Sequence, residues 1–224
     1  MSFTLFGRAG ACLLIAFGLA SLAPAAVAMS LEPMFDPAGR TLGAVTQQSF
    51  PKWYGAMSRS WAHSGREEAR CRQRMQRDCR LDLWQAFLGR LQGREPRMLL
   101  ERVNRFVNRV PYRPDHLAWN RSDYWAAPGE FFARGGDCED YAVAKYFSLR
   151  RLGIAPEAMH IVVVTDRVRK LAHAVLVVRD GDRQWLLDSL DDRIVDWRAQ
   201  DRYSPIYAVN EEKAWAPWNA DRAT

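Results

Sequence analysis

The strongest constraint on the fold is a change in the spacing of apolar residues at about Gly153. Before this glycine, apolar residues recur at helical spacing, and after it they form short alternating or β-branched runs. Asp180-Gly181, a typical two-residue hairpin loop, lies between two of the later runs. Helices followed by antiparallel strands predict an α+β domain in which helices pack on a sheet.

The same patterns predict the individual elements. An extended lead-in covers 29–49, and a long connection rich in aromatic residues covers 111–128, between the third and fourth expected helices. Trp119 and Trp125 lie in this connection, and loops of such length are commonly functional or heavily packed. The expected helices cover 50–61, 81–91, 99–110, 128–133 and 138–152, and the expected strands cover 159–165, 172–179, 184–190 and, more weakly, 194–197 and 205–209.

Residues 1–28 have the features of a cleaved secretory signal peptide. One basic residue, Arg8, precedes a short apolar run, and Ala26-Val27-Ala28 forms a small-residue exit. An uncleaved anchor is the alternative. We expect one domain over 29–224, with a helical part at 29–95, a core at 96–224 and no second membrane span. The net charge of +6 and the export signal indicate a solvated basic face rather than a nucleic-acid site.

Three cysteines follow the leader, an odd number in an oxidising compartment. Cys71 and Cys79 are too far apart on one continuous helix for a disulfide, so their pairing requires a bend between them. Two free thiols are the alternative. In either case Cys138 is the thiol that remains, so a reactive cysteine is expected there.

Cys138 follows Gly135-Gly136-Asp137 and precedes an expected helix. The diglycine permits a tight turn, and Asp137 is a good N-cap. Unpaired N–H groups at a helix N-terminus favour a thiolate. We therefore predict that Cys138 is a nucleophile at the first turn of this helix.

His173 is the expected base, and Asp188 is the expected carboxylate that orients it. If Asp180-Gly181 is the two-residue loop of the hairpin, His173 faces Asp188 directly across the two strands. A four-residue loop would instead place His173 opposite Leu190. In the first register, one ring nitrogen bonds the carboxylate and the other faces the thiol, which gives a nucleophile–base–orienter triad.

Asp137, Glu139 and Asp140 crowd three carboxylates around the thiol and should oppose its ionisation. One interpretation is that these acids complement the helix dipole. The other is a Ca²⁺ site, because clustered carboxylates and loop carbonyls suit this hard cation. No EF-hand spacing is present to decide between them.

Four segments resemble the bacterial transglutaminase-like cysteine proteinases, the LapG-type periplasmic peptidases. The resemblance covers most of the chain after the leader and is weakest before about residue 80. Where the family usually has Leu-Asp-Asn, this chain has Leu187-Asp188-Ser189. The segments are Ser122-Asp123-Tyr124-Trp125-Ala126, the run from Gly136 to Tyr146, His173-Ala174-Val175-Leu176 and Leu187-Asp188.

The resemblance implies a papain-like, transglutaminase-like core with a triad of Cys138, His173 and Asp188. It also implies dependence on Ca²⁺ held by Asp137, Glu139 and Asp140. The expected substrate is a large surface adhesin, cut near its N-terminus at a small-residue site to release it and promote biofilm dispersal. The expected regulator is an inner-membrane receptor for cyclic di-GMP, and the expected location is the periplasm.

Two other functions stay open on the sequence. A transglutaminase or an amidase acting on cell-envelope peptides would use the same triad and the same thioester. A non-catalytic binding module would use the aromatic connection, although all three triad residues are present. Trp119 and Trp125 are candidate oxyanion or substrate-groove residues, with plain packing as their alternative role.

Overall fold

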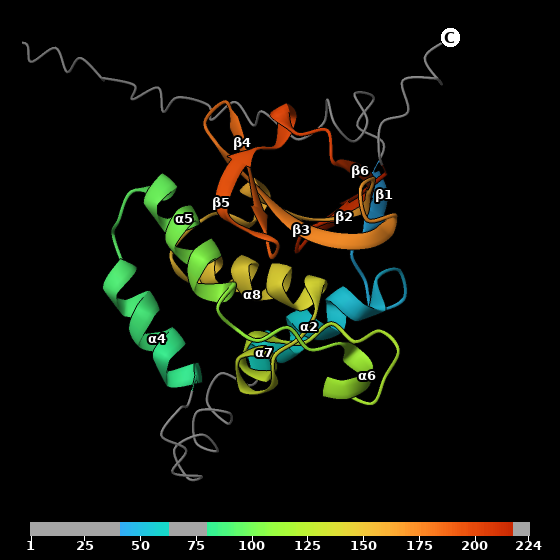
Figure 1. Cartoon of the computed structure of the whole chain (residues 1–224), viewed down its shortest axis with the longest axis horizontal. Helices are drawn as coiled ribbons and strands as arrows, with labels where there is room; N and C mark the ends of the chain where they lie inside the picture. Colours follow the sequence, from blue (N-terminus) through green and yellow to red (C-terminus); the bar gives the residue numbers. More distant parts are fainter. Residues whose placement is uncertain (1–40, 63–79, 217–224) are drawn as a thin grey trace, which may run out of the picture.

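The computed structural model describes residues 41–62 and 80–216. The leader, Cys71, Cys79 and the proposed pairing of these two cysteines lie outside the described residues. A seven-stranded antiparallel sheet in the order β1-β7-β6-β2-β3-β4-β5 carries helices on one face (Figure 1). The α+β prediction is therefore confirmed.

Every expected helix and strand is present, with small shifts at its ends. Pro96 begins α5, as expected for a first helical position, and Pro128 begins α7. The helices are α2 (Pro51–Ala62), α4 (Arg80–Leu91), α5 (Pro96–Val107), α7 (Pro128–Arg134) and α8 (Cys138–Arg151); the strands are β2 (Met159–Asp166), β3 (Leu171–Asp180), β4 (Arg183–Asp188), β5 (Asp191–Asp196) and β6 (Tyr203–Val209).

Several short elements were not expected from the sequence, among them two single-turn 3-10 helices, Pro156–Ala158 and Trp197–Ala199. Strand β1 (Thr41–Ala44), in the extended lead-in, pairs with β7 (Lys213–Trp215), so segments from opposite ends of the chain form one edge of the sheet. The short helix α6 (Asp115–Ala118) lies in the aromatic connection. This helix brings Asp115 into the site described below.

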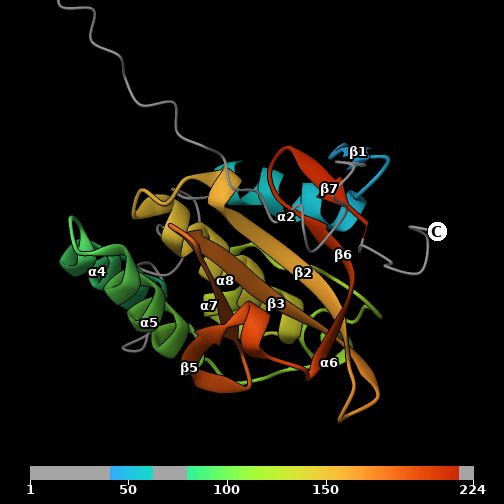
Figure 2. The same cartoon turned by 90° about the horizontal axis from the view of Figure 1, so that it is seen from above.

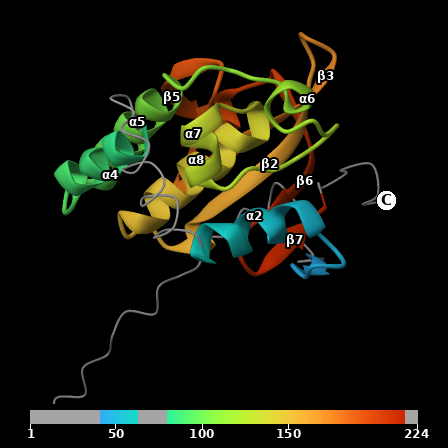
Figure 3. The same cartoon turned by 90° about the horizontal axis from the view of Figure 1, so that it is seen from below.

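Helix α8 is the centre of the fold. It lies between the sheet and the other helices (Figures 1 and 3), and almost its whole length is buried. One face of the sheet packs on α8 through residues such as Leu176 and Leu187. The opposite face holds a second core with Val175, Trp197 and Tyr203. Figure 2 shows β2 and β3 running over α8.

Helices α2 and α4 contribute Trp53 and Trp84 to the same core as α8. The predicted division between 29–95 and 96–224 stays a prediction. None of the helices within 41–62 and 80–216 is both long and apolar enough to cross a membrane.

Candidate active site

Two glycines form the turn that places Cys138 at the first position of α8. Gly135 has φ +80°, which favours glycine, and a Cβ there would lie 2.5 Å from the Pro111 carbonyl oxygen. A Cβ on Gly136 would lie 2.1 Å from Oδ2 of Asp140. Both positions therefore need glycine, one for its backbone angle and both for close packing.

Asp137 occupies the N-cap position, as predicted, but its side chain does not close the cap. Asp140 does so instead, because its Oδ2 accepts a hydrogen bond from the Asp137 N–H at 3.2 Å. The other oxygen of Asp140 accepts from the Ala126 N–H at 2.6 Å. Asp140 is fully buried, and this burial raises its pKa well above the usual range, although the Ala126 bond opposes the shift. Asp140 thus ties the aromatic connection to the start of α8.

The Cys138 thiol lies between α8 and β3. It donates to Oε2 of Glu139 at 3.1 Å, and the backbone N–H of Ala174, on β3, is near enough to the sulfur to lower its pKa. Burial raises the pKa of Cys138, and the charges of Glu139 and Asp137 raise it further, whereas the Ala174 N–H lowers it. The acids therefore oppose the thiolate, as expected, and the sulfur lies beside the peptide that joins His173 to Ala174.

His173 and Asp188 are buried and hydrogen-bonded to each other, with 2.8 Å between Nε2 and Oδ1. Asp188 also accepts from the Tyr203 hydroxyl at 2.5 Å and from the Leu190 N–H at 3.0 Å. Burial acts to raise the pKa of Asp188, but the bonds from His173 and Tyr203 outweigh it and hold the pKa below its usual value. A charged carboxylate therefore holds the His173 ring through Nε2.

The predicted hairpin register is wrong, although the His173–Asp188 contact is formed. Asp180 pairs with Arg183, so Gly181 and Asp182 form the two-residue loop. Gly181 takes φ +58° at the first loop position, which glycine permits most readily. One step further along, this register places Asp188, the last residue of β4, opposite Val175. Asp188 is the diagonal neighbour of His173, and its side chain reaches the ring from there.

Tyr203 and Lys145 are two buried residues near Asp188 that the sequence did not single out. Tyr203 comes from β6, and its ring lies 5.6 Å from that of His173. Lys145 is 1% exposed, and its Nζ has no hydrogen-bond partner within the described chain. Burial lowers the pKa of Lys145 to about 7, against the raising effect of Asp188 and Asp192. Lys145 therefore contributes only part of a positive charge near Asp188 at neutral pH.

Two further acids from the aromatic connection join the predicted acidic cluster. Asp115, Asp137 and Asp140 have carboxylate oxygens within 4.8 Å of one another, and so do Asp115, Asp123 and Glu139. Burial, followed by the charge of Glu139, raises the pKa of Asp137 to about 8. Burial also raises the pKa of Asp115 to about 6. Lys52 pairs with Asp123, but one cation does not balance five crowded carboxylates.

Unpaired oxygens within this cluster show that its residues fit a cation. Oδ1 of Asp115 and Oδ1 of Asp137 are buried and have no hydrogen-bond partner among residues 41–62 and 80–216. Their other oxygens are bonded: Asp137 Oδ2 accepts from the Asp115 N–H, and Asp115 Oδ2 accepts from the Tyr124 N–H. A set of carboxylate oxygens matches the ligand preference of Ca²⁺. The sequence analysis missed Asp115 and Asp123 because they are distant from Cys138 in sequence. Their position among the aromatic residues of the connection was the one feature that could have indicated a role in the site.

The two candidate groove tryptophans pack within the aromatic connection. Trp119 lies against Tyr124, with 4.8 Å between ring centroids. Its indole N–H is buried and has no hydrogen-bond partner within the described part of the chain. Trp125 is buried edge-on against Trp53 and lines a mostly apolar pocket of about 260 Å³ that also includes Tyr207. Their roles at an oxyanion or substrate site stay predictions.

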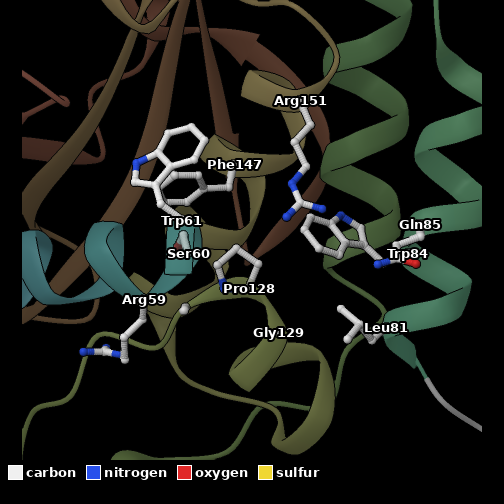
Figure 4. Close-up of a pocket in the computed structure, with 11 residues that line it drawn as sticks. Arg59, Ser60, Trp61, Leu81, Trp84, Gln85, Pro128, Gly129, Phe147 and Arg151 are labelled. Atoms are coloured by element: carbon white, nitrogen blue, oxygen red, sulfur yellow. The ribbon is translucent and has the colours of Figure 1, made fainter. Parts of the chain in front are cut away.

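A second pocket lies at the other end of α8 (Figure 4). Trp61 and Phe147 line one side of it, and Trp84 and Arg151 line the other. Its volume of about 20 Å³ is enough for roughly one water molecule. Arg151 is about 20 Å from Cys138 along the helix, given the 1.5 Å rise per residue. This pocket therefore lies apart from the candidate active site.

A thiol at a helix N-terminus, packed against two neighbouring strands that carry a hydrogen-bonded His–Asp pair, is the arrangement of a papain-like cysteine protease. Comparison with known proteins gives the same class. The family model of the bacterial transglutaminase-like cysteine proteinase BTLCP matches residues 66–223. The chain belongs to this family and is a cysteine protease.

Solved structures of LapG from Legionella pneumophila are similar to this chain. The calcium-bound form is 30% identical with a TM-score of 0.60, over 68% of this chain and 87% of LapG. The EGTA-treated form is 29% identical with a TM-score of 0.61, over 70% and 86% respectively. No curated protein gave a significant match. The fold is thus that of a transglutaminase-like cysteine proteinase, and such a protease acts on a protein substrate.

Proposed function

We propose that this chain is a periplasmic, calcium-dependent cysteine endopeptidase with Cys138 as nucleophile, His173 as general base and Asp188 as orienter. The observation that carries the proposal is the buried His173–Asp188 hydrogen bond of 2.8 Å between β3 and β4, together with Cys138 at the start of α8, the helix that packs against β3. This arrangement combines the three groups that thiol acyl transfer requires.

The proposed reaction follows from the hydrogen bonds of the triad. Because Asp188 binds Nε2 of His173, Nδ1 is the nitrogen that takes the thiol proton. The thiol is hydrogen-bonded to Glu139, so it must turn away from Glu139 before this transfer. The thiolate then attacks the scissile carbonyl carbon, and His173 gives the proton to the leaving amine. Water, deprotonated by His173, hydrolyses the thioester and restores the thiol.

Asp115, Asp123, Asp137, Glu139 and Asp140 are the residues that would hold Ca²⁺. When bound, the ion supplies positive charge that offsets the repulsion between the carboxylates and the thiolate. The unpaired oxygens of Asp115 and Asp137 and the similarity to a calcium-bound LapG support this part of the proposal.

The proposed substrate is a large surface adhesin, cut near its N-terminus and released to promote biofilm dispersal. The proposed regulator is an inner-membrane cyclic di-GMP receptor that sequesters the protease. The similarity to LapG-type proteinases supports both assignments, and the signal-peptide pattern at 1–28 supports export.

Product masses test this proposal against acyl transfer to an amine. The substrate is the N-terminal region of a large repeat adhesin from the same organism, incubated with enzyme, CaCl₂ and excess glycine ethyl ester. We expect two fragments whose summed mass exceeds that of the substrate by one water. A product that carries the ester amine would support a transglutaminase instead, and an intact adhesin would contradict the proposed substrate.

A further inference from the structure

Five exposed arginines converge on one groove between α4 and α5. The two helices lie side by side at one edge of the molecule (Figures 1, 2 and 3). The groove has a volume of about 530 Å³. Its lining consists of Arg90, Arg94, Arg102, Arg105 and Arg109 together with Phe87, Leu91, Met98 and Phe106.

The charge of this arginine groove is unbalanced. No acidic residue lines it, and among 41–62 and 80–216 none of its five guanidinium groups has a recorded ion pair or side-chain hydrogen bond. By contrast, Arg97 on the same helix α5 pairs with Glu101 at 2.8 Å. Guanidinium groups match carboxylates in a bidentate geometry. The groove is therefore complementary to several carboxylates in one ligand.

The floor of the groove is apolar and rigid. Phe87 from α4 stacks on Phe106 from α5, with 4.0 Å between centroids and 6° between planes. Leu91 is buried beside them, and Met98 is 41% exposed. A concave site with this floor does not match a flat membrane surface. It fits a polypeptide segment that carries both acidic and apolar side chains.

One end of the groove leads toward Cys138. Arg109 is followed by Val110, whose carbonyl accepts a hydrogen bond from the hydroxyl of Tyr141 on α8. Tyr112 then pairs with Gly136, two residues before the nucleophile. Since the Cα atoms of Arg109 and Tyr112 are at most about 11 Å apart, a chain lying in the groove can continue to the candidate active site.

We propose that the arginine groove binds an acidic, partly apolar segment of the protein substrate, outside the residues that flank the scissile bond. This proposal rests on the proposed endopeptidase function. Because one end of the groove leads toward Cys138, its expected ligand is the protein substrate and not another protein. Binding there would lower KM for substrates that carry such a segment and leave kcat unchanged.

The binding test uses the full mature chain with Cys138→Ala, so that no cleavage occurs. The probe is a fluorescein-labelled peptide of Glu-Leu-Glu-Glu repeats, measured by fluorescence anisotropy. The groove variant is Arg102→Glu with Arg105→Glu. The control is Arg183→Glu with Arg198→Glu, two exposed arginines on the β4–β5 side that give the same change in net charge. We expect Kd to rise at least about tenfold in the groove variant and less than about twofold in the control.

Equal weakening in both variants would show general charge attraction and overturn the proposal, as would no weakening in either. Equally tight binding of an oligothymidine of the same charge would assign the groove to polyanions rather than peptides.

A second, catalytic experiment adds the acidic repeat to a quenched fluorogenic peptide with an Ala-Ala site. With active enzyme, we expect the peptide that carries the repeat to have a lower KM than the same peptide without it. The groove variant should abolish this difference in KM and leave kcat unchanged. If the quenched peptide is not cut at all, the proposed function fails while the binding result still stands.

Discussion

Replacing Cys138 with alanine is expected to lower kcat/KM for adhesin cleavage by at least about 10⁴-fold, the order of loss seen when a covalent nucleophile is removed. The fold should persist, because the side chain is only partly exposed and its one recorded side-chain partner is Glu139. A change of this size near a surface shifts Tm by no more than about 2 °C. Fragment yield measures the first effect, and thermal unfolding measures the second.

The matched control for this prediction is Ala174→Gly, which keeps the N–H near the sulfur and should retain most activity. Cleavage by Cys138→Ala at a rate near that of the wild type would exclude Cys138 as nucleophile. A large fall in Tm would show that the loss of activity arises from unfolding.

Chelation with EGTA is expected to lower activity at least about 100-fold, with recovery on adding CaCl₂ but not MgCl₂. The carboxylates of the acidic cluster would then repel one another and the thiolate without a counter-charge. Chelation should also lower Tm by about 5–10 °C, since a ligand at 100 times its Kd stabilises a fold by about 2.7 kcal/mol. Calcium titrations of activity and of Tm measure both effects.

Asp115 gives the sharpest variant for this prediction, because one of its oxygens is unpaired. Asp115→Asn should raise the calcium concentration for half-maximal activity at least about tenfold. The exposed Asp201, changed to asparagine, should leave it unchanged. If neither activity nor Tm responds to EGTA, the acids only stabilise the start of α8 and the calcium proposal is wrong.

The sequence predicted the helices and central strands well because each has a clear apolar period. The two strands at the β1 end of the sheet are different. Thr41–Ala44 and Lys213–Trp215 are too short to show a period, and their pairing depends on contact between distant parts of the chain. Such tertiary pairing is not visible in local spacing.

Two parts of the site were also beyond local reasoning. Asp-Gly indicated the hairpin, but only the positive φ of Gly181 shows which residues form the loop, and this shifts the register around His173. Asp188 still reaches the ring because a carboxylate can span a diagonal position. Asp115 and Asp123 join the acidic cluster only because the connection folds back over the start of α8.

Alkylation of Cys138 by iodoacetamide tests the central claim most directly, because it reports the thiolate without needing a substrate. Peptide mapping by mass spectrometry separates Cys138 from Cys71 and Cys79. With calcium at pH 7, Cys138 should react at least about tenfold faster in the wild type than in His173→Ala or after EGTA treatment. Equal rates in all three samples would contradict a thiolate formed by His173 and supported by calcium.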